Sequence, residues 1–141
     1  MNFWDTSALV ALGVDEPHRE HALRVLEGDD RMAVWWGTTV EYVAAVSRRE
    51  REGNLTTAEA SALLAGLHAL SRTWYEVQPD RRVKELARRL LRVHPLRAAD
   101  GLQLASALAA AEEVPSSIGF VCLDARLNQA ASREGFAILP P

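Results

Sequence analysis

The stretch that decides the fold is Asn2-Phe3-Trp4-Asp5-Thr6-Ser7, which runs into the apolar segment Ala8-Leu9-Val10-Ala11-Leu12. The short apolar run before Asp5 is typical of a strand buried on both faces of a parallel sheet. Ser7 or Thr6 is a good N-cap for the second run, so a helix is expected over residues 7–14. Asp5 is therefore predicted where a central strand ends and a helix begins, at the end of an open α/β sheet that binds ligands.

Length and composition are those of an ordinary globular domain. The chain has 141 residues, of which 48% are hydrophobic, so residues 1–141 are expected to form one domain with a proper core. No apolar run approaches the roughly 20 residues of a membrane span. The first strand begins at residue 2, and no signal peptide is expected. The net charge of -3 argues against a general nucleic-acid coat protein, although a local basic patch remains compatible with binding a phosphate backbone.

Cys122 is the only cysteine of the chain. A disulfide framework within the chain is thereby excluded, and a reducing, cytoplasmic location fits. Because Cys122 lies in a strand-like segment, we interpret it as a core residue.

Strand-like and helix-like segments alternate along the chain. Further strands are expected at residues 32–36, 74–77, 120–123 and 136–139, and helices at residues 18–27, 40–52, 56–70, 79–94, 96–113 and 128–134. Thr56 and Glu59 match a capping box. Trp35 and Trp36 are predicted on opposite faces of a strand, with at least one of them in the core. The alternation predicts an α/β fold with right-handed crossovers and a mostly parallel sheet of four to five strands, covered by helices on both faces.

Four carboxylates occupy positions that set them apart from the other acidic residues. Asp5 and Asp124 each follow a buried strand, and Glu41 and Asp100 each lie in the first turn of an apolar helix. Four acids at one end of a sheet repel each other, which raises their pKa values unless a counter-ion is present. Mg²⁺ prefers oxygen ligands, keeps several waters and needs only one or two direct carboxylates. The set therefore predicts a divalent-metal site that positions a water for phosphodiester hydrolysis.

Each of these acids also has a structural explanation. Glu41 and Asp100 would complement the dipole of the helix they begin, and Asp5 alone is compatible with a capping role. The combination of all four, two of them at strand ends, favours the metal site.

Four segments resemble the motifs of PIN domains, and most of all those of the VapC-type toxins of bacterial toxin–antitoxin systems. They are Asp5-Thr6-Ser7-Ala8-Leu9-Val10, Glu41 within Thr39-Val40-Glu41-Tyr42-Val43, Leu96-Arg97-Ala98-Ala99-Asp100-Gly101-Leu102-Gln103-Leu104-Ala105, and Val121-Cys122-Leu123-Asp124-Ala125-Arg126-Leu127. The resemblance covers nearly the whole chain. It implies an α/β/α sandwich, a Mg²⁺- or Mn²⁺-dependent ribonuclease, and a homodimer inhibited by a small antitoxin.

The resemblance also carries catalytic and metal-binding roles onto Asp5, Glu41, Asp100 and Asp124. Two positions depart from the commonest pattern, because Gly101 stands where alanine is usual and Gln103 stands where histidine is frequent. Neither removes a ligand. We therefore expect them to bear on substrate or antitoxin contacts more than on the chemistry.

Four further residues are candidates for supporting roles. Thr6 and Ser7 are placed to orient Asp5 or a metal-bound water, and helix capping explains one of them equally well. Arg97 lies one turn before Asp100 and is a candidate to hold a phosphate or to pair with an acid. Asn128 lies one turn after Asp124, and its side chain either reaches the acidic site or faces solvent.

The leading interpretation is a metal-dependent endoribonuclease toxin. One alternative is a non-catalytic PIN-like module that binds RNA or protein, against which the intact acidic set argues. Another is a different Mg²⁺-dependent phosphoryl-transfer enzyme, although Asp5-Thr6-Ser7 lacks the paired acid that such enzymes tend to use. For the toxin, we expect an antitoxin tail that presents an Arg or Lys to the acids. The expected groove lies beside the site, with Leu9, Leu12 and Tyr42 as candidate walls.

Overall fold

The centre of the molecule is a parallel sheet, seen in a computed structural model that describes residues 1–14 and 16–139. Its five strands are β1 (Asn2–Trp4), β2 (Met32–Trp35), β3 (Tyr75–Val77), β4 (Gly119–Val121) and β5 (Ala137–Leu139). Their order in the sheet is β3-β2-β1-β4-β5, and every neighbouring pair is parallel. After β1, the chain adds β2 and then β3 on one side of it. It then crosses to the other side of β1 and adds β4 and then β5. The strand order reverses between β1 and β4, where the carboxyl ends of an open sheet form a ligand crevice.

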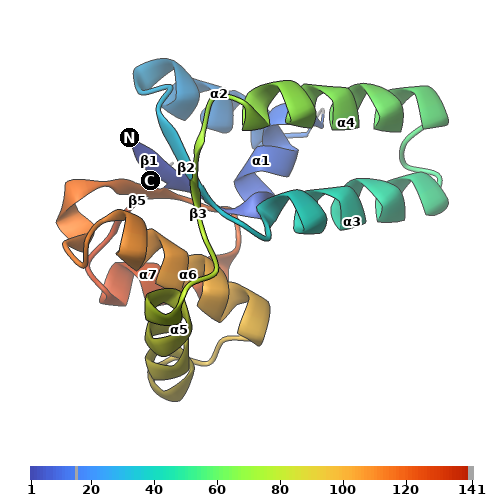
Figure 1. Cartoon of the computed structure of the whole chain (residues 1–141). Coiled ribbons are helices and arrows are strands. Elements are labelled where there is room, and N and C mark those ends of the chain that lie inside the picture. Colours follow the sequence, from blue (N-terminus) through green and yellow to red (C-terminus); the bar gives the residue numbers. More distant parts are fainter. Residues whose placement is uncertain (15, 140–141) are drawn as a thin grey trace.

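Helices cover both faces of this sheet (Figure 1). One face is covered by α1 (Thr6–Gly13), α2 (Arg19–Gly28), α3 (Thr38–Arg51) and α4 (Thr57–Ser71). The other is covered by α5 (Arg81–Val93), α6 (Ala98–Ala110) and α7 (Ala125–Arg133), and a short 3₁₀ helix, η1 (Pro115–Ser117), precedes β4. The predicted α/β/α sandwich is confirmed. Within the described ranges, every helix is too short or too polar to cross a bilayer.

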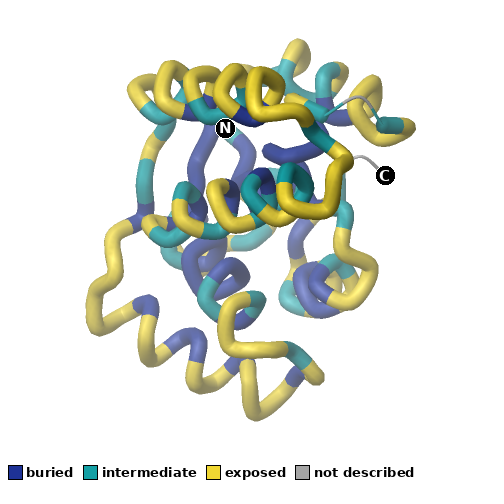
Figure 2. The backbone as a smooth tube through the Cα atoms, turned by 90° about the vertical axis from the view of Figure 1, so that its right-hand side faces the viewer, coloured by how far each residue is buried: buried dark blue, intermediate teal, exposed yellow. Residues whose placement is uncertain are grey.

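Side chains alternate along the central strands between two hydrophobic cores. Phe3 on β1 and Phe120 on β4 face α5, α6 and α7, with their ring centroids 5.8 Å apart. Their neighbours Trp4 and Val121 face α1 to α4. All four side chains are fully buried, and the burial is concentrated in the strands and the inner helix surfaces (Figure 2). Helices on both faces thus explain why the strands are continuously apolar.

Two helices begin on an aspartate rather than where the sequence predicted. The side chain of Asp5 caps α1 by accepting a hydrogen bond from the Ser7 backbone N–H, so neither Ser7 nor Thr6 is the N-cap. Asp124 caps α7 by accepting from the Leu127 backbone N–H, which starts this helix three residues before the predicted residue 128. Both caps bring a carboxylate to the carboxyl end of the sheet.

Two other helix ends test the sequence prediction. The helix α6 ends at Ala110 instead of near residue 113, because Glu112 and Glu113 adopt left-handed backbone conformations with φ of 51° and 59°. The capping box of Thr56 and Glu59 is present as predicted at the start of α4.

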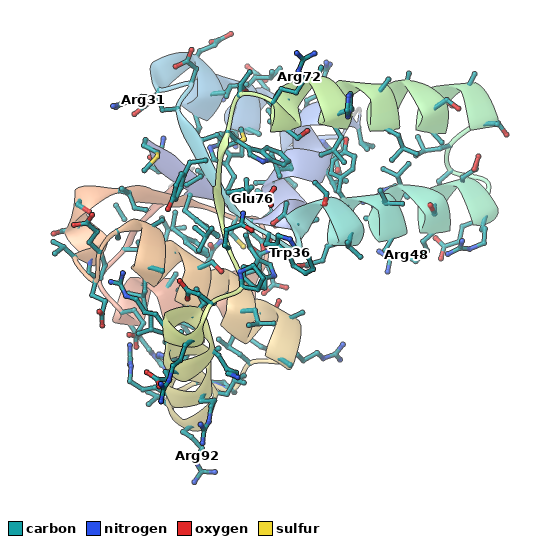
Figure 3. All side chains as sticks on the ribbon, in the orientation of Figure 1. Arg31, Trp36, Arg48, Arg72, Glu76 and Arg92 are labelled. Atoms are coloured by element: carbon teal, nitrogen blue, oxygen red, sulfur yellow. The ribbon has the colours of Figure 1, made fainter. Side chains whose placement is uncertain are left out.

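The two adjacent tryptophans have different environments. Trp35 ends β2 and belongs to the core shared with α5 to α7, whereas the side chain of Trp36 is 49% exposed. Figure 3 shows Trp36 beside the start of α3. The expectation that at least one of the pair is a core residue is confirmed.

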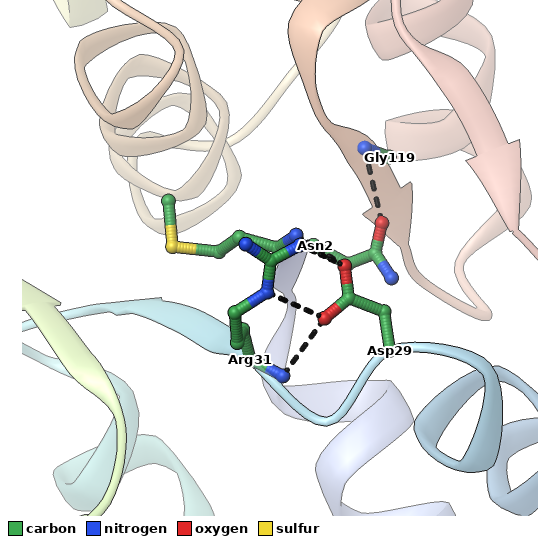
Figure 4. Close-up of polar contacts among 5 residues, drawn as sticks. Asn2, Asp29, Arg31 and Gly119 are labelled. Atoms are coloured by element: carbon green, nitrogen blue, oxygen red, sulfur yellow. Dashed lines mark hydrogen bonds and ion pairs between the residues drawn. The ribbon is translucent and has the colours of Figure 1, made fainter.

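Polar contacts join the amino ends of the central strands (Figure 4). The Gly119 backbone N–H donates to Asn2 Oδ1 at 3.1 Å, which joins β4 to β1. Asp29 accepts hydrogen bonds from the Arg31 guanidinium at 3.0 and 2.9 Å, and one from the Met1 amino group. The Arg31 guanidinium, followed by the amino group, lowers the pKa of the Asp29 carboxyl. At this end of the sheet, the acid is paired with cations.

We predict that Phe120→Ala lowers the free energy of unfolding by about 3–5 kcal/mol, because it empties the space between Phe3 and Phe136 in a fully buried core. Urea denaturation measures the loss. Tyr75→Ala is the control, since Tyr75 is 57% exposed on β3 and its truncation should cost less than about 1 kcal/mol. Equal losses for the two variants would contradict the core assignment.

Candidate active site

The crevice between β1 and β4 is flanked by two of the four predicted acids. Asp5 directly follows β1, and its backbone N–H donates to the Val121 carbonyl at 2.9 Å, which extends the β1–β4 pairing. Asp124 follows β4 after two further residues. Glu41, from α3, and Asp100, from α6, are close enough to Asp5 for its charge to raise the pKa of each carboxyl. The fold therefore brings the four acids to one region, and their catalytic role stays a prediction.

Asp5 is a buried carboxylate that lacks a cation partner among the described residues. It is 6% exposed, and its Oδ2 accepts from the Ser7 backbone N–H at 3.0 Å and from the Ser7 hydroxyl at 2.6 Å. Burial nevertheless raises the pKa of the Asp5 carboxyl above its usual value, because these hydrogen bonds offset only part of the lost hydration. A buried carboxylate without a cation favours the binding of a positive group from outside the chain.

Ser7 ties Asp5 to the segment that leaves β4. Besides donating to Asp5, the Ser7 hydroxyl accepts a hydrogen bond from the Leu123 backbone N–H at 3.0 Å. The predicted orienting role of Ser7 toward Asp5 therefore has a direct structural basis, whereas the capping alternative is wrong.

Glu41 has a half-buried carboxyl group with a strongly raised pKa. Burial in the first place, and then the negative charges of Asp5 and Asp100, raise the pKa of Glu41 to about 7. A hydrogen bond from the Gln103 amide acts in the opposite direction. A carboxyl group with such a pKa exchanges a proton readily near neutral pH.

Gln103 connects three helices beneath the site. It is 1% exposed, and its Nε2 lies 3.0 Å from Thr6 Oγ1, 3.4 Å from Thr38 Oγ1 and 3.2 Å from Glu41 Oε1. The expectation that Gln103 bears on substrate or antitoxin contacts is therefore wrong, because its side chain is inaccessible to either. Thr6 supports the site through this amide.

Gly101 is also inaccessible to a partner. A Cβ at this position would lie 2.9 Å from Leu91 Cδ2, so the glycine allows α6 to pack closely against α5. The expectation of a substrate or antitoxin contact at Gly101 is wrong for the same reason as at Gln103.

Asp100 and Asp124 complete the acidic group. Burial, followed by the charges of Asp124 and Asp5, raises the pKa of the Asp100 carboxyl. Arg97 acts in the opposite direction, but no ion pair joins it to a carboxylate among the described residues. Asp124 is exposed, and its Oδ1 accepts the Leu127 backbone N–H at 2.8 Å, which leaves its other oxygen for a ligand.

Two residues near the end of β4 differ from the simplest sequence interpretation. Asn128 donates from Nδ2 to the Cys122 carbonyl at 2.9 Å, so it supports the backbone that leads to Asp124 and is not a solvated helix position. Cys122 is buried as predicted, but its Sγ lies 3.5 Å from Asp5 Oδ2. Burial raises the pKa of this thiol. A cysteine inside an apolar strand gives no sequence signal of such a contact.

The donor set fits a hydrated hard cation better than a closed metal cage. Within residues 1–14 and 16–139, no three His, Cys, Asp or Glu side chains lie close enough together to enclose a metal ion. A structural zinc site needs such a cage, whereas Mg²⁺ keeps several waters and needs one or two direct carboxylates. The unpaired charge around Asp5 is the feature that such a cation would compensate.

We predict that the stability of the EDTA-treated protein falls from about pH 5 to about pH 8. The Glu41 carboxyl has a pKa of 4.5 when unfolded and about 7 when folded, so the folded state holds the extra proton between these values. The contribution of Glu41 to the free energy of unfolding is fully present below pH 4.5 and is lost as the pH rises through about 7. Asp5 and Asp100 shift in the same direction.

Urea denaturation across this range measures the effect. Glu41→Gln should flatten the decline, and Glu52→Gln, at the exposed end of the same helix, should leave it unchanged. A pH profile that is identical in the Glu41→Gln variant and the parent would show that Glu41 does not carry the shift.

Comparison with known proteins agrees with the fold. A family model described as the PIN domain matches residues 3–131. No curated protein matches the sequence significantly. Among solved structures, VapC20 of Mycobacterium tuberculosis, described as a sarcin-ricin loop cleaving toxin, is 20% identical with a TM-score of 0.71 over 100% of both chains.

Two further solved structures resemble this chain to a similar degree. FitAcB from Neisseria gonorrhoeae is 18% identical with a TM-score of 0.69, covering 100% of this chain and 98% of the other. A toxin–antitoxin complex from Klebsiella pneumoniae is 18% identical with a TM-score of 0.62, covering 88% and 87% of the two chains. At these identities, the likeness shows a shared fold.

Proposed function

Because the chain belongs to the PIN domain family, we propose that it is a metal-dependent endoribonuclease and the toxin of a toxin–antitoxin pair. The observation that carries the proposal is the Asp5 carboxylate, which is buried at the strand-order reversal without a cation partner among the described residues. Three more acids face the same region.

The four acids divide the expected chemistry between them. Asp5, Asp100, Glu41 and Asp124 would hold Mg²⁺ or Mn²⁺, directly or through water. A bound ion of this kind supplies Lewis acidity and lowers the pKa of a bound water. Glu41 is the proposed proton acceptor for the attacking water, because its half-buried carboxyl lies near Asp5 and Asp100. The Gln103 amide donates to Glu41 Oε1 at 3.2 Å and so orients this carboxylate.

The substrate and partner rest on similarity. VapC20 is described as a sarcin-ricin loop cleaving toxin, and the structure from Klebsiella pneumoniae is described as a toxin–antitoxin complex. These descriptions support an RNA substrate and an antitoxin for this chain. The homodimer implied by the sequence resemblance stays a prediction.

We predict that Asp5→Asn reduces RNA cleavage by at least about 100-fold while the protein stays folded. Asparagine retains an oxygen that accepts from Ser7, and it removes the buried charge, so the metal-free variant should melt no lower than the parent. Cleavage with mapped RNA ends and melting temperatures measure the two effects.

Mn²⁺ supplies a second measurement for the same variant. The ion should raise the melting temperature of the parent by binding the folded state, and this shift should shrink in Asp5→Asn. The control is Asp30→Asn, at an exposed position outside the site. Undiminished cleavage by Asp5→Asn at saturating Mn²⁺, or full cleavage by the parent in EDTA, would contradict the proposal.

An apolar cavity beside the site suits an antitoxin segment. It has a volume of about 320 Å³ and is lined by residues of α1, α2, α3 and α4. The predicted walls Leu9, Leu12 and Tyr42 all line it, although Leu9 and Tyr42 are also buried core residues. The cavity shares α1 with Asp5, which caps this helix, and α3 with Glu41, so we place the antitoxin segment on the elements that carry these two acids.

We predict that Leu63→Glu, in the wall of this cavity, weakens antitoxin binding by at least about tenfold without changing cleavage by the free toxin. The probe is the antitoxin, which is to be sought as the product of a short reading frame beside the gene. Val114→Glu, at an exposed position outside the cavity, is the control. Replacing the basic residue of the antitoxin tail by Ala should also relieve inhibition. If the antitoxin still inhibits tightly after both substitutions, it binds outside this cavity.

A further inference from the structure

A second cavity adjoins the acidic site and has a different character. Its volume is about 300 Å³, and Thr6 and Ser7, the two residues after Asp5, form part of its wall. Arg48 and Arg49 from α3 line the cavity, together with His18 from the start of α2. Glu16 contributes an acidic side chain. We call this cavity the arginine pocket.

Within residues 1–14 and 16–139, the fold does not use the two arginines as ion-pair partners. Among the described residues, no carboxylate pairs with either guanidinium. Arg49 donates from Nη1 to the Ala45 carbonyl of its own helix at 3.4 Å, its one hydrogen bond to the described part of the chain through its side chain. Arg48 is exposed and projects from α3 on the side away from α4 (Figure 3). Both guanidinium groups therefore keep donors for a ligand.

Helix electrostatics alone does not explain this arrangement. Basic residues at the end of α3 complement the helix dipole, and Arg48, Arg49 and Arg51 all lie in its last turn. Only Arg48 and Arg49 line the pocket. The helix dipole favours a basic residue at all three positions, so it does not explain why Arg48 and Arg49 line the pocket and Arg51 does not.

The neighbouring acids create a need for such cations. An RNA strand at the crevice brings negative phosphates towards Asp5, Glu41 and Asp100, and the repulsion opposes binding on both sides of the reacting bond. A guanidinium fork matches the oxygens of a phosphate and donates two hydrogen bonds to it. A volume of about 300 Å³ suits one phosphate with part of its ribose.

We propose that the arginine pocket binds a backbone phosphate adjacent to the bond that is cut, and this rests on the proposed ribonuclease function. Arg48 and Arg49 provide the charge, and His18 adds a ring N–H donor. Glu16 opposes the ligand and limits the affinity of the pocket for phosphate. The pocket fixes on which side of the acids the RNA backbone continues, namely toward α1 and the end of α3.

The experiment compares four variants of the full chain: Arg48→Gln, Arg49→Gln, Arg51→Gln and Glu16→Gln. Binding of a fluorescent single-stranded RNA oligonucleotide is measured in EDTA at several salt concentrations, and kcat and KM are measured with Mn²⁺. Arg48→Gln and Arg49→Gln should each weaken binding by about tenfold and raise KM without changing kcat. Each should reduce the slope of log affinity against log salt by about 0.7. Arg51→Gln should match the parent, and Glu16→Gln should bind more tightly.

The outcomes separate this proposal from the proposed function. If Arg48→Gln and Arg49→Gln bind RNA like Arg51→Gln, the pocket proposal is overturned while cleavage by the parent still supports the ribonuclease. If these variants bind RNA normally but escape the antitoxin, the arginines serve a protein partner and the proposal is again overturned. If the parent binds RNA through the pocket but does not cut it, the pocket stands and the ribonuclease function fails.

Discussion

The Asp5 carboxyl group lies at the end of the central strand, shielded from solvent, and hydrogen bonds from Ser7 offset only part of its lost hydration. Such a group destabilises a fold unless it is neutralised by a proton or by a cation. The sheet order places it at the reversal between β1 and β4, where the helices of both faces begin. Glu41, Asp100 and Asp124 add to the negative charge at this end of the sheet. Ser7 orients Asp5, and Gln103 orients Glu41. The amino end shows the contrast, because Asp29 is paired there with Arg31 and the chain's amino group.

The choice of Gln103 shows how the site orients an acid without neutralising it. A lysine or arginine at this buried position would pair with Glu41 and compensate its charge permanently. The neutral amide donates to Glu41, Thr6 and Thr38 and leaves the net charge of the site intact. The geometry of α1, α3 and α6 is thus fixed by hydrogen bonds, while the affinity for a cation is retained.

Much of this arrangement follows from patterns in the sequence. The apolar runs next to Asp5 and Asp124 identify strands buried on both faces. What the sequence does not reveal depends on contacts between distant segments. The contact of Cys122 with Asp5 spans 117 positions, and that of Gln103 with Thr6 spans 97.

Helix ends were predictable only where a local rule decides them. Thr56 and Glu59 cap each other within one turn, so their motif was sufficient. At Asp5, three successive polar residues are all able to cap the helix; Asp5 is the cap, and the Ser7 hydroxyl instead accepts from the Leu123 backbone N–H after β4. At Glu112 and Glu113, helix-forming side chains are overridden by a left-handed backbone that turns the chain toward β4.

The position of Cys122 has a consequence for how opening of the crevice can be observed. The chain has one thiol, it is 2% exposed, and burial raises its pKa, so reagents that attack thiolates find no target in the closed protein. Its sulfur touches Asp5, which means that any fluctuation exposing the sulfur also loosens the carboxylate. The rate at which Cys122 is alkylated therefore reports local opening at the crevice, and no added probe is needed. A ligand that requires the closed arrangement slows this reaction in proportion to its occupancy.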